Sequence, residues 1–331
     1  MTAPHRRRSP APALGLVLAL LLAALVSGCS VFSATPTPLP SPAASAPPTT
    51  APSTAPVRCT NALESYRPSG ELPSPGDLPA GSTMAKIKAR GRLIAGVSAD
   101  TNLLASRNPL KGRIEGFDID MVKAVAKAIF GNEDAYELRV ITAAQRIPAL
   151  TDNSVDVVVR AMTINCARWQ QIAFSTEYYR AGQKILVRRG ANATRLSDLS
   201  GQKVCAPNGT SSMENLKRDA PKAIAVGADS HTGCLVLFQQ GEVTAITGDD
   251  TVLAGLAAQD PYAVVPRQTA FTTEPYGIGV NRRNVDLVRF VNARLAQMRS
   301  NGEWTTIYNR WLAAPLGPAP DPPRAVYGRD A

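Results

Sequence analysis

The sequence has little of several residue types on which catalysis and metal binding usually depend. Its 331 residues include only two histidines, and aromatic residues make up 5% and charged residues 19%. His5 and His231 therefore leave little scope for a histidine metal site or histidine-based catalysis. Apolar residues reach 44%, so the composition excludes a largely disordered chain and a coiled coil. Domains have about 150 residues on average, so the length of this chain predicts two domains or one elaborate domain.

Long apolar runs are also lacking, apart from one at the N-terminus, and this excludes a protein with many membrane spans. Arg6, Arg7 and Arg8 precede an apolar stretch at residues 14–26, which is short for a membrane helix. Small residues follow it. This order is that of a secretory signal peptide.

The segment Leu25-Val26-Ser27-Gly28-Cys29 resembles a bacterial lipobox. In such signals the cysteine thiol is diacylated, and the chain is cleaved immediately before this cysteine. We expect residues 1–28 to be removed and Cys29 to anchor the protein at the extracytoplasmic face of the plasma membrane. Stable anchoring needs more than one acyl chain. The alternative is an uncleaved N-terminal anchor in which the cysteine is incidental.

The segment that follows Cys29 predicts a tether. Residues 30–57 carry no charged side chain and consist mainly of Pro, Ala, Ser and Thr, a composition that cannot build a core. A second Pro-rich stretch, 315–323, predicts a C-terminal tail. Loss of residues 1–28 lowers the formal charge from +10 to about +7. The basic residues are scattered, which favours attraction to anionic lipid or ligand over binding of nucleic acid.

Four cysteines remain after Cys29, namely Cys59, Cys166, Cys205 and Cys234. An even count in an exported chain predicts two disulfides, for which three connectivities are possible. Cys205 and Cys234 share one region and are paired here, which leaves Cys59 with Cys166. No Cys-x-x-Cys spacing occurs, so neither a zinc nor a redox site is expected.

Between residues 84 and 312, short strand-like segments alternate with helical ones. Strands are predicted over 92–98, 137–141, 155–159, 183–187, 203–206, 223–226, 243–247, 262–265 and 276–280. Helices are predicted over 118–130, 145–150, 212–218, 234–240, 251–258, 285–298 and 304–312. Asp118 and Asp120 lie at the positive end of the first of these helices, and Gly131 ends it. The alternation predicts an α/β fold with mostly parallel sheets, in which ligands bind in loops at the strand ends.

Five short motifs occur in order within this region. They are Gly116-Phe-Asp-Ile-Asp120; Val155-Asp-Val157 with Met162-Thr-Ile-Asn165, Arg168 and Phe174-Ser-Thr-Glu-Tyr-Tyr179; Gly201-Gln-Lys-Val204 with Asn208-Gly-Thr-Ser211; Thr247-Gly-Asp-Asp250; and Pro275-Tyr-Gly-Ile278 with Asn301-Gly-Glu-Trp304. Together they resemble the extracellular amino-acid-binding proteins of ABC transporters, the family 3 solute-binding proteins of the glutamine/glutamate-binding type. The resemblance spans about residues 93–312.

The resemblance implies an α/β fold of two lobes, the clamp of periplasmic binding proteins, with two crossing hinge strands. Lobe 1 would comprise residues 84–177 and 278–331, and lobe 2 residues 183–273. The crossings would fall at 178–182 and 274–277. The extension at 58–83 lies outside the resemblance, and we expect it to pack on lobe 1, tied by Cys59–Cys166.

The resemblance also implies a binding site for a free amino acid. Its carboxylate and its ammonium both lose water in a closed cleft, so each needs a partner, and arginine suits a carboxylate. The positions that match the family's α-carboxylate site are Arg168, Thr163, Thr210 and Ser211. Asp249 matches the ammonium site, with Asp250 as the alternative. Thr210 and Ser211 could instead form only a turn and a helix cap.

The sequence departs from the family pattern near Arg168. Ala161 stands where glycine is frequent, and Cys166-Ala167 replaces a pair that usually ends in Glu, so a disulfide could fix the arginine's loop. Arg160 would suit an acidic ligand side chain unless it points to solvent. Asp100 and Arg107 lie in a loop that borders the side-chain pocket in the family, and no aromatic residue is present at 101–104. Ala161, Arg160 and Asp100 are candidate ligand-binding residues, whereas His231 is expected at the surface.

The expected function is that of a monomeric, lipid-anchored receptor for a polar or acidic L-amino acid, which it delivers to an ABC permease. Glutamate or aspartate is favoured, and glutamine or asparagine is possible. The alternative is that the ligand-bound form is presented to a membrane signalling protein. An enzyme is not expected, because Asp249 would be engaged with the ammonium and no other general acid or base faces the ligand. No cofactor, metal or nucleic acid is expected.

Overall fold

The computed structural model describes residues 59–330. Cys29, the signal segment and the tether lie outside the described residues. Within the described part, none of the helices has the length and apolar character needed to cross a membrane.

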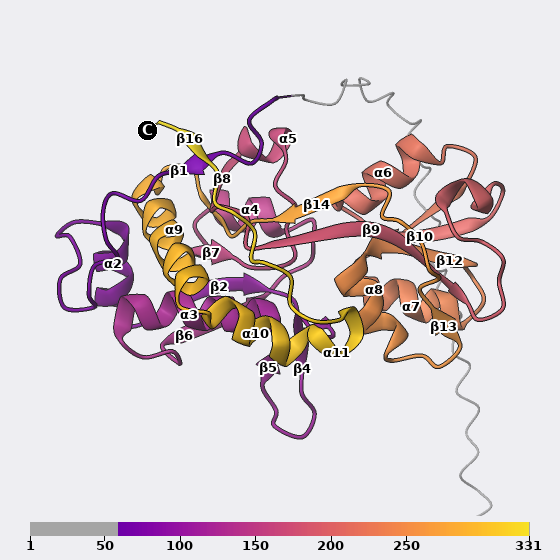
Figure 1. Cartoon of the computed structure of the whole chain (residues 1–331), viewed down its shortest axis with the longest axis horizontal. Helices are drawn as coiled ribbons and strands as arrows, with labels where there is room; N and C mark the ends of the chain where they lie inside the picture. Colours follow the sequence, from indigo (N-terminus) through magenta and orange to yellow (C-terminus); the bar gives the residue numbers. More distant parts are fainter. Residues whose placement is uncertain (1–58, 331) are drawn as a thin grey trace, which may run out of the picture. The chain divides into compact units, whose positions relative to one another are not determined.

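The first lobe is built on a five-stranded sheet (Figure 1). Its order is β6 (Tyr136–Val140), β2 (Leu93–Val97), β7 (Val157–Val158), β15 (Gly279–Asn281) and β8 (Ile172–Phe174). Strand β2 is buried at every position, as its continuous apolar sequence predicts. Helices α2 (Thr83–Arg90), α3 (Phe117–Phe130), α9 (Val285–Ser300) and α10 (Glu303–Trp311) supply buried side chains to the same core.

The second lobe is built on a sheet with the order β11 (Ile224–Ala228), β10 (Lys203–Pro207), β12 (Ala245–Asp249), β9 (Tyr179–Arg188) and β13 (Ala263–Val264). Helices α6 (Ser211–Asp219), α7 (His231–Gln239) and α8 (Asp250–Ala257) and the short 3-10 helix at Leu196–Leu199 pack on it. Most of their buried side chains form two core clusters that are separate from the core of the first lobe, whereas Val252 of α8 belongs to the core of the first lobe.

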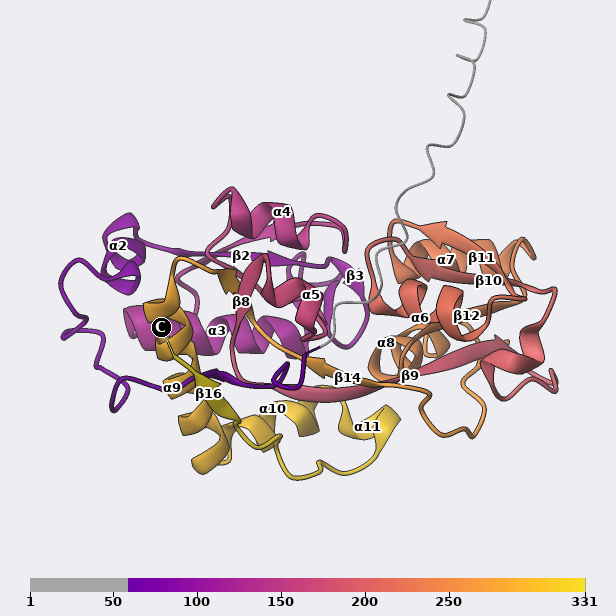
Figure 2. The ribbon, with the colours of Figure 1, turned by 90° about the horizontal axis from the view of Figure 1, so that it is seen from above.

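Two neighbouring strands connect the lobes (Figure 2). The first four residues of β9 pair antiparallel with β14 (Thr273–Tyr276), and its remaining residues pair with β12 and β13. The prediction of one strand over 276–280 was wrong, because the chain changes partners there. Gly277 donates its N–H to Met162 O, and β15 begins only at Gly279. A side chain at Gly277 would collide with Ile164, 2.7 Å from its Cβ position.

The prediction of mostly parallel sheets holds for only half of each sheet. Strand β2 runs parallel to β6 and β7, and β10 runs parallel to β11 and β12. The strands β15 and β9, which lie next to the lobe crossings, run antiparallel to their neighbours. A chain that leaves one lobe and later returns must re-enter the sheet in the opposite direction.

The two ends of the described chain meet on the first lobe. Strand β1 (Ser65–Tyr66) pairs with β16 (Tyr327–Arg329). The predicted Pro-rich tail is therefore not a free tail: α11 (Ala313–Leu316) leads into a segment whose Pro323 carbonyl accepts a 2.8 Å bond from Arg299 Nε. The extension contacts this lobe through Ser65 Oγ, which donates to Phe174 O at 2.7 Å.

The structure has disulfides between Cys59 and Cys166 and between Cys205 and Cys234, the same pairing that we expect from the sequence. The sequence patterns missed helix α2, strand β8 and several shorter elements. Among the shorter ones are β3 (Asp100–Thr101), β4 (Ala105–Arg107), β5 (Ile114–Glu115) and α5 (Cys166–Trp169). Helix α4 (Arg146–Thr151) lies within one residue of its prediction.

Candidate ligand-binding site

Residues of both lobes line a small cavity. Those from the first lobe are Ser98, Thr101, Asp118, Arg146, Arg160, Ala161 and Thr163, and those from the second are Thr210, Ser211, Ser212, His231, Asp249 and Val252. The cavity has about 30 Å³ of free volume, room for about two water molecules. An amino acid is larger, so the lobes or the lining side chains must move to admit one.

Three of the lining residues carry a buried polar atom without a hydrogen-bond partner. They are Asp249 Oδ1, Arg160 Nε and His231 Nε2, and within residues 59–330 only Arg299 Nη1 shares this property. A buried polar atom that lacks a partner costs about 1–3 kcal/mol, so native structures keep few of them. That three of the four face one cavity marks it as a site where a polar ligand supplies the missing bonds.

Asp249 ends strand β12 and precedes helix α8. Its Oδ2 accepts a 2.6 Å hydrogen bond from the Tyr276 hydroxyl, and its side chain does not cap the helix. Burial, then the charge of Glu274, raises the pKa of Asp249 to about 8. Asp250 instead accepts from Gly182 N–H at 3.4 Å and lies 4.0 Å from Lys184 Nζ, away from the cavity lining. Of the two aspartates, the structure therefore places Asp249 in the cavity.

Arg146 is a lining residue that the sequence analysis missed. It is 3% exposed, and its Nη2 donates to Gly209 O of the other lobe at 2.9 Å. Its other bonds also go to carbonyl oxygens, so no carboxylate of the described chain pairs with it. Burial and the charges of Arg168 and Arg160 lower its pKa. This crowding of positive charge favours an anionic group in the cavity. Only the solitary charge of Arg146 within 141–151 could have drawn attention to it.

Arg160 and Asp118 face the same cavity. Asp118 Oδ1 accepts from the Tyr178 hydroxyl at 2.8 Å, and its Oδ2 accepts from Ala161 N–H at 2.9 Å. Burial raises the pKa of Asp118 to about 6, although its place at the start of α3 suggested only a helix-end charge. Arg160 therefore lines the cavity and does not simply point to solvent. Burial lowers the pKa of Arg160, whereas the negative charges of Asp100 and Asp118 act to raise it.

Ala161 adopts a φ of 42°, in the left-handed region. This conformation costs little for glycine, which explains why glycine is frequent here in the family that the sequence resembles. The N–H of Ala161 already donates to Asp118. Ala161 would therefore contact a ligand as part of the cavity wall rather than through this N–H.

Arg168 lies beside the cavity rather than in its lining. It is 6% exposed and belongs to helix α5, where Asn165 Oδ1 accepts its backbone N–H at 2.9 Å. Its Nη1 donates to Thr163 O at 2.6 Å, and its Nη2 lies 3.5 Å from Gly209 O. The guanidinium thus contacts both lobes. To bind a ligand carboxylate, it would have to give up a hydrogen bond to one of these carbonyl oxygens.

The hydroxyls expected to bind the α-carboxylate already bind a carboxylate of the chain. Thr163 Oγ1 and Ser211 Oγ both donate to Glu274 Oε2 at 2.7 Å, and Asn215 Nδ2 donates to Oε1 at 3.0 Å. Glu274 lies in the hinge strand β14 and is 2% exposed. Glu274 falls within the predicted crossing at 274–277, and no pattern in the sequence predicts a role for it.

Thr210 forms a helix cap, the alternative role that we consider for it from the sequence. Its Oγ1 donates to Pro207 O at 2.6 Å and accepts from Met213 N–H at 3.2 Å, so it caps helix α6. The hydroxyl is therefore occupied, although Thr210 lines the cavity. The start of α6 faces the cavity and presents the positive end of the helix to it.

The expectation that His231 lies at the surface was wrong. His231 begins α7 and lines the cavity, and its Nε2 is buried. Burial and the charge of Arg160 lower its pKa to about 3, so the imidazole is neutral. A neutral imidazole has one donor and one acceptor nitrogen. Its neighbours come from distant segments, so the sequence around His231 gave no signal.

Asp100 and Arg107 do not line the cavity. Asp100 accepts from Ser98 Oγ at 2.8 Å, and although burial opposes it, hydrogen bonds from Ser230 and Ser98 lower its pKa. Its backbone O accepts from Thr232 Oγ1 of the second lobe at 2.7 Å. Arg107 is exposed, and its Nη1 donates to Gly112 O at 2.9 Å. It therefore does not border the cavity.

Two α/β lobes that enclose a charged cavity at a two-stranded hinge define a solute-binding clamp. Residues 93–314 match the model of the bacterial extracellular solute-binding proteins, family 3, and the chain belongs to this family. As the family's name states, its members are extracellular proteins that bind solutes.

Similar proteins of known identity bind amino acids. The chain is 35% identical to the ABC transporter glutamine-binding protein GlnH of Bacillus subtilis, over 70% of this chain and 84% of that protein. It is 28% identical to the glutamate-binding protein GluB of Corynebacterium efficiens, over 73% and 84%.

Solved structures are similar as well. An ancestral arginine-binding protein bound to glutamine is 32% identical and has a TM-score of 0.63, with 67% of this chain and 98% of that chain covered. The arginine-binding protein ArgBP of T. maritima in its holo form is 28% identical with a TM-score of 0.61, and the coverage is 69% and 98%.

Proposed function

We propose that the protein binds an acidic L-amino acid between its lobes and delivers it to an ABC importer. The observation that carries this proposal is the set of unpartnered polar atoms with complementary character, Asp249 Oδ1 and Arg160 Nε, in one buried cavity. A zwitterion with an anionic side chain supplies an ammonium to the first and a carboxylate to the second.

Each part of the ligand has a candidate partner. Asp249 receives the ammonium. Arg168, Thr163 and Ser211 receive the α-carboxylate once Glu274 releases the two hydroxyls. Arg146, Arg160 and His231 remain for the side chain.

Glutamate or aspartate fits this arrangement better than glutamine or asparagine. Arg146 bonds only to carbonyl oxygens within the described chain, and a ligand carboxylate would give it a charged partner. The neutral His231 can serve either an acid or an amide, so the relatives named for glutamine leave the amides as the second candidates.

The organisation of the chain follows from the same function. In this proposal residues 1–28 are cleaved, Cys29 is lipidated, and residues 29–57 hold the monomeric receptor at the extracytoplasmic face of the membrane. Lobe 1 comprises 84–177 and 278–331, lobe 2 comprises 183–273, and the hinge lies at 178–182 and 274–277. The pairing of β9 with β14 over Tyr179–Gly182 supports this hinge position.

A thermal-shift panel of the twenty amino acids with the purified mature protein tests the proposal. A ligand at 100 times its Kd should add about 2.7 kcal/mol to the free energy of unfolding. Glutamate and aspartate should give the largest shifts, and calorimetry then gives their Kd values. A panel in which no amino acid changes the melting temperature would contradict the proposed function.

A further inference from the structure

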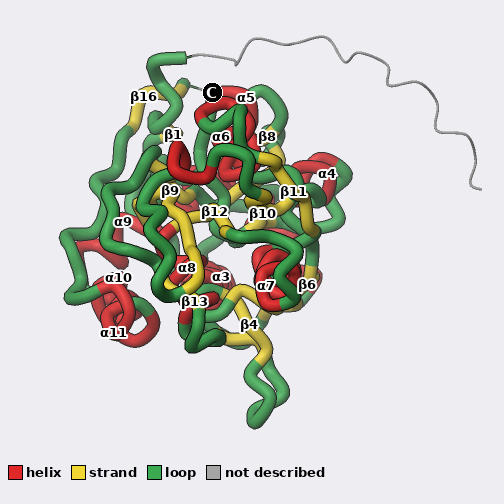
Figure 3. The backbone as a smooth tube through the Cα atoms, turned by 90° about the vertical axis from the view of Figure 1, so that its right-hand side faces the viewer, coloured by secondary structure: helices red, strands yellow, loops and turns green. Residues whose placement is uncertain are grey.

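A hairpin of the first lobe projects away from the rest of the described chain (Figures 1 and 3). It is formed by β4 and β5, and β3 pairs with β4 at its base. We define the hairpin tip as residues 107–113. Leu110 lies in this tip and is 95% exposed, more than any other large apolar side chain of residues 59–330.

Hydrogen bonds within the tip hold Leu110 in this position. Asn108 Oδ1 accepts the N–H groups of Leu110 and Lys111 at 3.0 and 3.1 Å. Asn108 also exchanges backbone bonds of 2.8 Å with Gly112 and Arg113. An apolar side chain that is displayed on a pre-ordered loop loses little conformational entropy when a partner covers it.

The surroundings of Leu110 are basic. Arg107, Lys111 and Arg113 are exposed, and the side chains of the last two are 54% and 65% exposed. Glu115 is the one acidic residue beside them, and it lies 3.2 Å from Lys111 Nζ and 3.6 Å from Arg113 Nε. The excess positive charge complements an apolar pocket with an acidic rim.

The base of the hairpin touches both the cavity and the second lobe. Thr101 in β3 lines the cavity. Asp100 O accepts from Thr232 Oγ1 of α7 at 2.7 Å, and Asn102 Nδ2 donates to Gly255 O of α8 at 3.3 Å. The fit is close, because a Cβ on Gly255 would lie 2.6 Å from Asn102 O. These contacts hold the base of the hairpin against the second lobe in this conformation.

We propose that the hairpin tip docks into an acidic, apolar pocket on the extracytoplasmic face of the importer's permease and presents the closed receptor to it. This inference rests on the proposed import function. A second copy of the chain is a poor partner, because its net charge has the same sign as that of the tip. A lipid surface gains nothing from a contact that depends on lobe closure.

Two variants test the tip without touching the cavity. They are Leu110→Asp and the double variant Lys111→Glu with Arg113→Glu, and Tyr262→Asp is the matched control because Tyr262 is 71% exposed on the second lobe. Each is expressed as the full chain in a strain that lacks the native gene. The readouts are uptake of labelled glutamate and the Kd of the purified protein.

We expect uptake to fall by about ten-fold or more in both tip variants, while their Kd values and the uptake with Tyr262→Asp stay at wild-type levels. Wild-type uptake with both tip variants would overturn the docking proposal alone. If deletion of the whole chain leaves uptake intact although the purified protein binds glutamate, the import function fails and the docking proposal fails with it.

A photo-cross-linking residue at position 110 gives an independent readout in intact cells. We expect an adduct with a permease subunit that increases when glutamate is added, and no such adduct from position 262. Flotation of the Cys29→Ala protein with phosphatidylglycerol vesicles is the competing arm. Vesicle binding that Leu110→Asp abolishes would assign the tip to lipid and overturn the proposal.

Discussion

The Tyr276 hydroxyl donates a 2.6 Å hydrogen bond to Asp249 Oδ2, which joins the hinge strand β14 to the end of β12. The other carboxylate oxygen, Asp249 Oδ1, has no hydrogen-bond partner in the described structure. The bond from Tyr276 also opposes the rise in the pKa of Asp249, which burial and Glu274 bring to about 8. The proposed ammonium site therefore holds its proton at neutral pH until a ligand arrives.

Ligand affinity should rise with pH up to about the pKa of Asp249. An ammonium binds the carboxylate, so binding below pH 8 must release the Asp249 proton. The association constant should then rise by about ten-fold per pH unit and level off near that pKa. Calorimetry in two buffers of different ionisation enthalpy measures the proton release. An affinity that stays constant between pH 6 and 8 would contradict this assignment.

Substitutions of Arg168 and Arg160 should differ in their effects on ligand affinity. Arg168→Ala should weaken every amino acid alike, because each presents an α-carboxylate; loss of one partner of a buried charge pair costs roughly 3–5 kcal/mol, or about two to three and a half decades in Kd. Arg160→Ala should weaken glutamate and aspartate far more than their amides, which lose only about 0.5–1.5 kcal/mol.

Calorimetry with glutamate, aspartate, glutamine and asparagine measures both effects. Arg195→Ala is a suitable control, because the Arg195 side chain is 74% exposed and Arg195 does not line the cavity. An unchanged ratio of acid to amide affinity in Arg160→Ala would place this residue outside the side-chain pocket. Tight binding by Arg168→Ala would refute the family-based position of the α-carboxylate.

Local patterns predicted most of the elements but little of the chemistry between them. The periodicity of 118–130 gave helix α3 within one residue of its start. The same pattern described Asp118 as a helix-end charge, whereas its carboxylate is bonded to Tyr178, sixty residues away. The periodicity of apolar residues indicates which face of a helix or strand is buried. It carries no information about which distant residues contact that face.

The missed cavity residues have the same cause. Arg146 is held by carbonyl groups at Arg160, Ala161 and Gly209. The pairing of β1 with β16 likewise joins the two ends of the described chain. The resemblance to a family supplied Arg168 and Asp249 as candidates, because it carries spatial information that a single sequence lacks.

Glu274→Gln should shift the pH dependence of binding to lower pH. The charge of Glu274 is the second-largest cause of the raised pKa of Asp249, after burial, so a neutral amide lowers that pKa. The substitution also replaces the charged oxygen that accepts hydrogen bonds from the Thr163 and Ser211 hydroxyls. Affinity for glutamate at pH 6 should therefore increase. The exposed Glu71→Gln is the control, and an unchanged midpoint in Glu274→Gln would refute the coupling.

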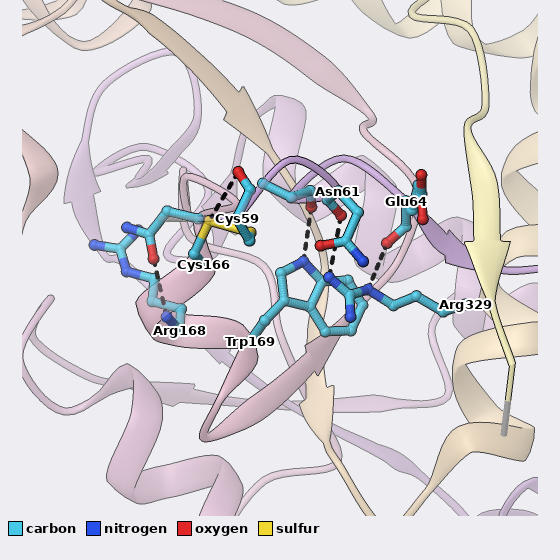
Figure 4. Close-up of a disulfide and its surroundings, with 9 residues drawn as sticks. Cys59, Asn61, Glu64, Cys166, Arg168, Trp169 and Arg329 are labelled. Atoms are coloured by element: carbon cyan, nitrogen blue, oxygen red, sulfur yellow. Dashed lines mark hydrogen bonds between the residues drawn. A yellow bond between two sulfur atoms is a disulfide. The ribbon is translucent and has the colours of Figure 1, made fainter. Parts of the chain in front are cut away.

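The Cys59–Cys166 disulfide should hold the proposed carboxylate arginine in place. Cys166 and Arg168 share the four-residue helix α5 (Figure 4). Trp169 Nε1 donates to Ala62 O at 2.7 Å, and the Arg329 guanidinium lies 3.8 Å from the Trp169 ring centroid. The extension and the C-terminal strand thus pack against the outer side of this helix.

Replacing Cys59 and Cys166 with serine should lower affinity for all amino acids together, because an arginine that is less well positioned affects the shared α-carboxylate. Across a sequence separation of 107 residues, chain entropy predicts a loss of about 5 kcal/mol of stability, against about 4 kcal/mol for Cys205–Cys234 with its separation of 29. Stability alone hardly separates the two disulfides, so affinity is the informative readout.

Replacing Cys205 and Cys234 should loosen α7 and His231 and so change the ratio of acid to amide affinity instead. Non-reducing peptide maps establish the connectivity, and a peptide that joins Cys59 to Cys205 would overturn this account of how Arg168 is positioned.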